Sequence, residues 1–213
     1  PERFSQTMDW GVRMVLLLGL PAMAGIMVLR EPILRVLFMR GEFGPHEVMM
    51  SSASLLASTS GLLSLMLARV LAPGFHARQD TKTPVRYGIH SMAANMVFNL
   101  ILIWPLGYVG LALSTALSGT VNAISLFQGL YRRHIYRPGR DSLVFALRLS
   151  VAALTMYGLL AWLSPQLDVW VKWPMWRAGL ELTKLVVLGG ACYLLVALGL
   201  GVRPRQLKTV SEG

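Results

Sequence analysis

The sequence predicts an all-α integral membrane protein that crosses the bilayer six times. Of its 213 residues, 54% are hydrophobic and only 14% are charged, and the mean hydropathy is strongly positive. A soluble domain carries about 25% charged residues, so this chain has too few to cover a globule of its size. Long charge-free runs are the second observation, and an unequal distribution of basic residues between loops is the third. This composition argues against a soluble enzyme and excludes a disordered chain.

The transmembrane segments follow from the charge-free runs, because about 20 apolar residues span the hydrocarbon core. Residues 14–29 and 48–68 are free of charge. The run 87–131 is also free of charge but is too long for one helix, and Trp104-Pro105-Leu106-Gly107 predicts the break within it. Two further runs cover 149–167 and 185–202. We therefore expect helices at about 10–30, 48–72, 86–104, 108–130, 144–163 and 177–200.

Local signals refine these boundaries. Thr83 followed by Pro84 predicts a capped helix start, and Pro21 predicts a kink inside the first helix. The segment 136–142 (YRPGRDS) is expected to be a loop. The segment 30–47 is amphipathic and predicts an interfacial helix followed by a turn. The chain begins with proline rather than methionine, so we expect a piece of a longer or processed protein.

The orientation is predicted from lysine and arginine, which accumulate in cytoplasmic loops. One side of the expected bundle holds eleven basic residues: Arg3, Arg78, Lys82, Arg86, Arg132, Arg133, Arg137, Arg140, Arg203, Arg205 and Lys208. The other side holds five: Arg30, Arg35, Arg40, Lys172 and Arg177. Both termini are therefore expected in the cytoplasm. The net charge of +10 is read as this topology signal, and a nucleic-acid partner is not expected.

Tryptophans at the expected helix ends fit this reading, because indole rings favour the headgroup layer. The outer group is Trp104, Trp162, Trp170, Trp173 and Trp176, and Trp10 lies at an inner end.

No metal or cofactor site is expected from the sequence. Cys192 is the single cysteine and has apolar neighbours, which is typical of a packed thiol. The four histidines lie far apart in the sequence, and no nucleophile–base set, phosphate loop or carboxylate pair is present. The chain is therefore not expected to be an enzyme.

Small and polar residues form stripes on three consecutive helices. The second carries Ser51, Ser54, Ser58 and Gly61; the third carries Ser91, Asn95 and Asn99; the fourth carries Gly110, Ser114, Ser118 and Asn122. Such stripes are typical of seams between bilayer helices. They also fit the wall of a water-filled cavity, which makes Asn95, Asn99, Ser118 and Asn122 candidate substrate-path residues.

Charged residues also occur inside the expected spans, and for Arg69 two readings remain open. Arg69 falls on the polar face of the second helix, where a buried charge usually has a role. Its position near the inner end also allows its side chain to extend to the headgroups. Glu181 and Lys184 lie three residues apart and are expected to form an interfacial ion pair. Arg13 and Arg148 fit simple anchoring at inner helix ends.

Three segments resemble the MurJ (MviN) family of lipid II flippases. Residues 70–85 (VLAPGFHARQDTKTPV) resemble the family's inner loop, with Pro-Gly-Phe, Arg-Gln-Asp and Lys-Thr-Pro in order. Residues 32–43 (PILRVLFMRGEF) resemble its outer-loop pattern, which includes Arg40, Gly41, Glu42 and Phe43. Residues 107–114 (GYVGLALS) resemble another recurring stretch. The resemblance covers essentially the whole chain.

The resemblance implies a fourteen-helix transporter of the multidrug/oligosaccharidyl-lipid/polysaccharide exporter superfamily, of which this chain would be the last six helices. The implied activity moves lipid II, the lipid-linked peptidoglycan precursor, across the bacterial cytoplasmic membrane by alternating access. Residues 1–142 would complete the second lobe. Residues 143–213 would form the extra helix pair, which is associated with a groove for the lipid tail, and a cytoplasmic tail. Lipid II, membrane lipids and the N-terminal remainder of the transporter are the implied partners.

The family's best-known functional arginines lie in earlier helices and have no counterpart in this chain. The inner loop does match, at Arg78, Asp80, Lys82, Thr83 and Pro84. Gly74 permits bending there, and the charges can form breakable pairs, so Arg78, Asp80, Lys82 and Arg69 are gating or substrate-path candidates. Two alternatives remain open: an exporter of another lipid-linked sugar or small drug, and a membrane scaffold without transport activity.

Overall fold

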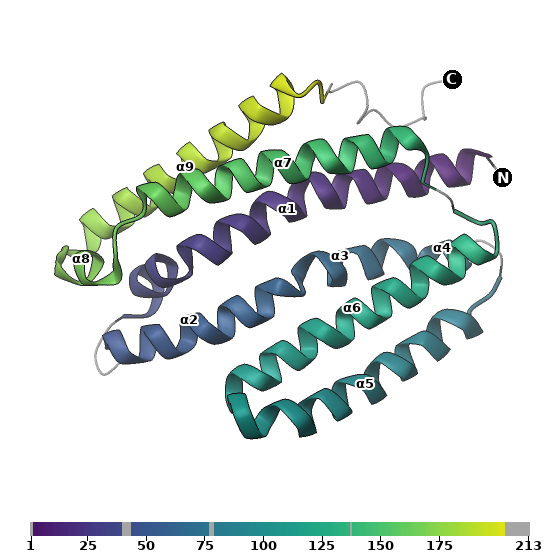
Figure 1. Ribbon diagram of the computed structural model, residues 1–213, viewed down its shortest axis with the longest axis horizontal. Coiled ribbons are helices and arrows are strands. Elements are labelled where there is room, and N and C mark those ends of the chain that lie inside the picture. Colours follow the sequence, from purple (N-terminus) through teal and green to yellow (C-terminus); the bar gives the residue numbers. More distant parts are fainter. Residues whose placement is uncertain (1, 40–43, 77–78, 137, 203–213) are drawn as a thin grey trace.

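The computed structural model describes residues 2–39, 44–76, 79–136 and 138–202 (Figure 1). These parts of the chain contain helices joined by short connections and no strand. Within them, six helical segments are long and apolar enough to cross a bilayer, which confirms the expected number: Gln6–Phe38, Pro45–His76, Lys82–Leu106, Tyr108–Arg132, Arg140–Leu163 and Met175–Gly199. Helix α1 begins and α9 ends toward the same end of the bundle (Figure 1).

The first helix, α1 (Glu2–Phe38), is longer than expected and passes through both Pro21 and Pro32. Its 37 residues measure about 55 Å at 1.5 Å per residue, more than the hydrocarbon core needs. The expectation of a separate interfacial helix from residue 30 is therefore wrong. The physical reason is tertiary packing: Arg35, only 7% exposed, donates a hydrogen bond to the carbonyl of Trp173 at 3.2 Å.

The second span is divided into α2 (Pro45–Ser60), α3 (Leu62–Leu71) and α4 (Pro73–His76), where one helix was expected. Gly61 lies at the first break and packs on α6. A Cβ atom built at Gly61 would lie 2.4 Å from the Cα of Ala116, so only glycine permits this approach.

The third and fourth spans form a hairpin of α5 (Lys82–Leu106) and α6 (Tyr108–Arg132), with the break where the sequence predicted it. Gly107 has a φ of +55°, which favours glycine. Helix α5 begins at Lys82, one residue before the expected cap Thr83. The capping oxygen comes instead from Asp80, which accepts from the Thr83 N–H at 3.0 Å.

The last two spans are α7 (Arg140–Leu163) and α9 (Met175–Gly199), joined by the short helix α8 (Leu167–Lys172). Trp104, Trp162 and Trp176 are 89%, 82% and 69% exposed at span ends, as interface anchors should be. Trp170 is fully buried and stacks edge-on against Trp173, so the anchor reading is wrong for Trp170. Helix α8 places the Trp170 ring against the apolar core.

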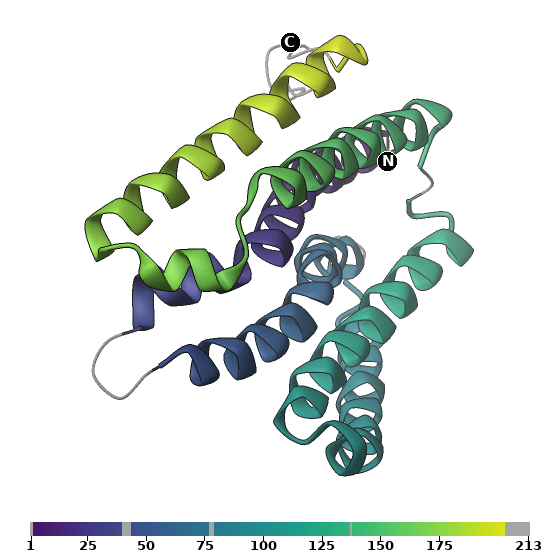
Figure 2. The same ribbon diagram turned by 60° about the vertical axis from the view of Figure 1, so that its left-hand side comes forward.

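Two apolar clusters hold the bundle together, and α1 contributes to both. One cluster joins α1 to α7, α8 and α9, and includes Leu29, Leu149, Leu160 and Trp170. The other joins the start of α1 to α3, α4 and α6, and includes Phe75 and Leu126. Figure 2 shows the resulting arrangement, with α7 and α9 on one side, the α5–α6 hairpin on the other and α1 to α3 between them.

Candidate functional site

The connection between α4 and α5 is organised around the carboxylate of Asp80. Asp80 accepts from the Thr83 N–H at 3.0 Å and from the Thr83 hydroxyl at 2.7 Å. It also forms an ion pair with Arg133, which follows the last residue of α6. Arg133 donates a second hydrogen bond to the Thr83 hydroxyl at 3.0 Å. A loop and the ends of two helices are thus tied together by three side chains.

An aromatic pair lies beneath this ion pair. The guanidinium of Arg133 lies 5.7 Å from the centroid of the Phe75 ring, and Phe75 meets Tyr87 edge to face at 6.2 Å. Phe75 is fully buried, so the Arg133 guanidinium packs on an aromatic ring that is held in the apolar core. The sequence indicated Asp80 as a site residue, whereas Arg133 was counted only as an inner-loop charge.

Hydrogen bonds from Thr83, side chain first and then backbone, together with Arg133, lower the pKa of Asp80 to about 2. A lowered pKa means that the Asp80 contacts stabilise the folded state above about pH 4, its value in an unfolded chain. That stabilisation is lost as the pH falls through about 2. We expect Asp80→Asn to lower the thermal unfolding midpoint at pH 6, with the difference from wild type shrinking toward pH 2. A difference that is constant from pH 6 to pH 2 would contradict the assignment.

The other inner-loop candidates are not gathered around Asp80. The side chains of Arg69 and Lys82 are exposed, and Arg69 forms no hydrogen bond or ion pair with the part of the chain that the structure describes. Arg78 lies outside the described residues, as do Arg40, Gly41, Glu42 and Phe43 of the outer-loop motif. Their proposed roles remain predictions.

Three of the four polar-stripe candidates meet in the seam between α5 and α6. The Asn95 amide donates to the Ser118 hydroxyl at 3.2 Å, and the Asn99 amide donates to the Asn95 carbonyl oxygen at 3.1 Å. Ser91 donates to the Ser118 backbone carbonyl at 2.7 Å. These contacts match the seam reading of the stripe.

Two amide oxygens next to this seam keep unused hydrogen-bonding capacity. The Oδ1 atoms of Asn99 and Asn122 are buried and have no partner in the described parts of the chain. A buried carbonyl oxygen without a donor is costly, so these atoms favour a further polar group or water at this position. The cavity-wall reading therefore stays a prediction for Asn95, Asn99, Ser118 and Asn122.

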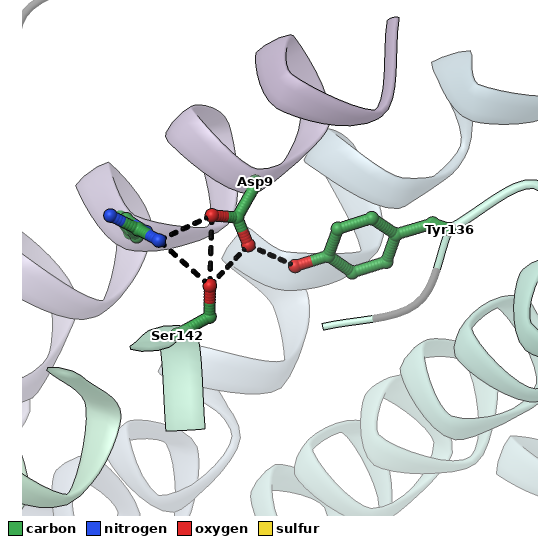
Figure 3. Close-up of polar contacts among 4 residues, drawn as sticks. Asp9, Tyr136 and Ser142 are labelled. Carbon is green, nitrogen blue, oxygen red and sulfur yellow. Dashed lines mark hydrogen bonds and ion pairs between the residues drawn. The ribbon is translucent and has the colours of Figure 1, made fainter. Parts of the chain in front are cut away.

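A second polar cluster joins the start of α1 to the segment between α6 and α7 and to the first turn of α7 (Figure 3). Asp9 accepts from the Tyr136 hydroxyl at 2.9 Å and from the Ser142 hydroxyl at 2.6 Å. Arg13 forms an ion pair with Asp9 at 2.7 Å and donates to the Ser142 hydroxyl at 2.9 Å. Arg13 also lies 5.5 Å from the centroid of the Phe145 ring.

This cluster is largely closed to water, because Tyr136 and Ser142 are buried and Asp9 and Arg13 are 21% and 17% exposed. Burial, with the charge of Asp9 beside it, raises the pKa of Tyr136, so its hydroxyl stays a donor. The sequence reading of Arg13 as a simple anchor missed this role. An acid and a base four residues apart in the first span was the available signal.

Comparison with known families decides the identity of this bundle. The family model described as "Lipid II flippase MurJ" matches residues 2–177. The chain belongs to the MurJ lipid II flippase family. This family consists of transporters, which agrees with the expectation that the chain is not an enzyme.

Several MurJ relatives align with nearly the whole chain. It is 51% identical over 99% of its length to a probable lipid II flippase MurJ of Vibrio cholerae, and 46% identical over 97% to one of Haemophilus influenzae. It is 33% identical over 94% of its length to the lipid II flippase MurJ of Burkholderia cenocepacia. The chain spans about 40% of the length of the first two relatives and 38% of the third.

The fold agrees with that of a solved MurJ structure. A lipid II flippase MurJ in an inward closed conformation superposes with a TM-score of 0.74 at 22% identity, covering 91% of this chain and 38% of that one. The six spans of this chain are therefore arranged as in that MurJ structure.

Proposed function

We propose that this chain is the C-terminal part of a transporter that moves lipid II from the inner to the outer leaflet of the bacterial cytoplasmic membrane. The observation that carries the proposal is the 51% identity over 99% of the chain to a protein named as a probable lipid II flippase. The activity would belong to the whole transporter, since the relatives are more than twice as long as this chain.

The division of labour within the chain is also a proposal. Residues 1–142 complete the second lobe, and residues 143–213 form an added helix pair and tail, with both ends in the cytoplasm. Support comes from the charge bias of the loops, eleven basic residues against five. The apolar clusters also support it, because α7 and α9 contribute to the first cluster and supply no residue to the second, which joins α1, α3, α4 and α6.

In this proposal the contact of Asp80, Thr83 and Arg133 is a cytoplasmic gate element. The Asp80–Arg133 ion pair is partly exposed, so it can open and reform at little cost. The exposed Arg69 lies near the same end and would attract the pyrophosphate of lipid II. Charge attraction and a breakable pair are the two physical elements that such a gate needs.

The test is complementation of a bacterium depleted of its own flippase by the full-length parent gene. We expect the parent to restore growth and to place labelled precursor in the outer leaflet. We expect Asp80→Ala and Arg133→Ala to lower both readouts, and the double variant to be no worse than either single one, because both remove the same contact. Arg69→Ala should lower transport at unchanged protein level.

Lys184→Ala is the matched control, because its pair with Glu181 lies on the exposed side of α9. Full transport by Asp80→Ala and Arg133→Ala at normal expression would exclude the gate. Failure of a well-expressed parent would exclude lipid II as the substrate. That outcome would favour another lipid-linked sugar or a small drug if export of such a compound is found, and a scaffold if none is.

A further inference from the structure

A half-open cavity of about 480 Å³ lies between helices α6 and α7, near the end of the bundle where α1 begins. Its walls come from α1, α3, α6 and α7, and they are almost wholly apolar: Leu16, Leu67, Ala123, Phe127 and Ala146 are representative. This volume lies in the range of about 300–1,000 Å³ that is typical of ligand sites.

The cavity lies between the two apolar clusters. Helix α7 packs on α1 and α9, whereas α6 packs on α5, α2 and α3, so the apolar packing stops between α6 and α7. On the open side, Ile124 and Leu143 are exposed at the rim. The lining helices are all candidate spans, which places the rim at membrane depth, and we take it to face lipid hydrocarbon.

The polar end of the cavity is the cluster of Figure 3, since Arg13, Tyr136 and Ser142 line it. Asp9 neutralises Arg13 there, and the hydroxyls are already bonded, so the cavity offers no net charge to an ion. Outside it, the same end of the bundle is basic. The described side chains there include one exposed acid, Asp141, against six exposed bases: Arg69, Lys82, Arg86, Arg132, Arg133 and Arg140.

We propose that this cavity holds one acyl chain of a bilayer phospholipid, which completes the packing between the two apolar clusters. The apolar walls select hydrocarbon, and the exposed bases at this end of the bundle, outside the cavity, complement the phosphate that every phospholipid carries. The lipid is a structural component that joins α7 to α6, independent of the substrate that the transporter carries.

The test uses the full-length protein in nanodiscs that contain a phospholipid with a diazirine on one acyl chain. After illumination, mass spectrometry locates the labelled residues. We expect labelling of Leu67, Phe127 and Ala146 to be several-fold higher than labelling of Met96 and Leu195, which are exposed elsewhere on the bundle.

Two variants remove the site in different ways: Ala146→Leu fills the cavity, and Ile124→Trp covers its rim. Both should lose the excess labelling, whereas Ala191→Leu on an exposed face of α9 should keep it. Unfolding midpoints within a few degrees of wild type exclude misfolding as the cause. Equal labelling of all exposed apolar residues, or excess labelling that persists in both variants, would overturn the proposal.

Discussion

Gly61→Ala is expected to destabilise the protein by about 3 kcal/mol, the upper end of typical overpacking effects. The added methyl group would lie 2.4 Å from the Cα and 2.6 Å from the Cβ of Ala116, so it meets backbone that no side-chain rotation can move aside. Relieving the contact requires α2 and α3 to move away from α6. Ser64 and Thr120, hydrogen-bonded at 3.0 Å along the same interface, would separate as well.

The measurement is thermal unfolding of the purified full-length parent in detergent, together with its level in the membrane. Gly158→Ala in α7 is the matched control, because a Cβ there meets open space. Alanine is the better helix former by up to about 1 kcal/mol, so the control should be neutral or stabilising. Only Gly61→Ala is therefore expected to destabilise the protein. Equal midpoints for both would show that the approach of Gly61 to Ala116 does not matter.

Asp9→Ala has the second largest expected effect, a loss of about 2–3 kcal/mol. Without Asp9, the guanidinium of Arg13 keeps its hydrogen bond to the Ser142 hydroxyl and its contact with the Phe145 ring but has no counter-charge, and the Tyr136 hydroxyl loses its acceptor. Removing one partner of a fully buried ion pair costs about 3–5 kcal/mol. The expected value is smaller here because Asp9 and Arg13 keep 21% and 17% exposure.

A double-mutant cycle separates this loss from general disruption. Arg13→Leu removes the unpaired charge, so Asp9→Ala combined with Arg13→Leu should be more stable than Asp9→Ala alone. Lys184→Ala is the control, since the Glu181–Lys184 pair is far more exposed and should contribute under about 1 kcal/mol. Thermal unfolding of the same parent protein gives all four values. Additive losses in the cycle would contradict a coupled pair.

The candidate site shows where sequence reasoning reached its limit. Asp80 was predicted as a site residue because it is a charged loop residue within the inner-loop motif. Arg133 lies 53 residues away, and nothing local to either residue indicates that they pair. The same holds for Tyr136 and Ser142, whose partner Asp9 is more than 120 residues earlier in the chain.

Composition and charge-free runs were enough to predict the class of protein, the number of spans and the hairpin break at Gly107. These features depend on the cost of placing charged groups and unpaired backbone groups in hydrocarbon. The composition of each segment determines by itself whether the segment avoids that cost. The length of α1, the break at Gly61, the burial of Trp170 and the membership of both polar clusters were decided only by tertiary structure. Each of them depends on which helices approach closely enough to exclude lipid and water, and in a bilayer that choice rests on small residues and polar partners far apart in sequence.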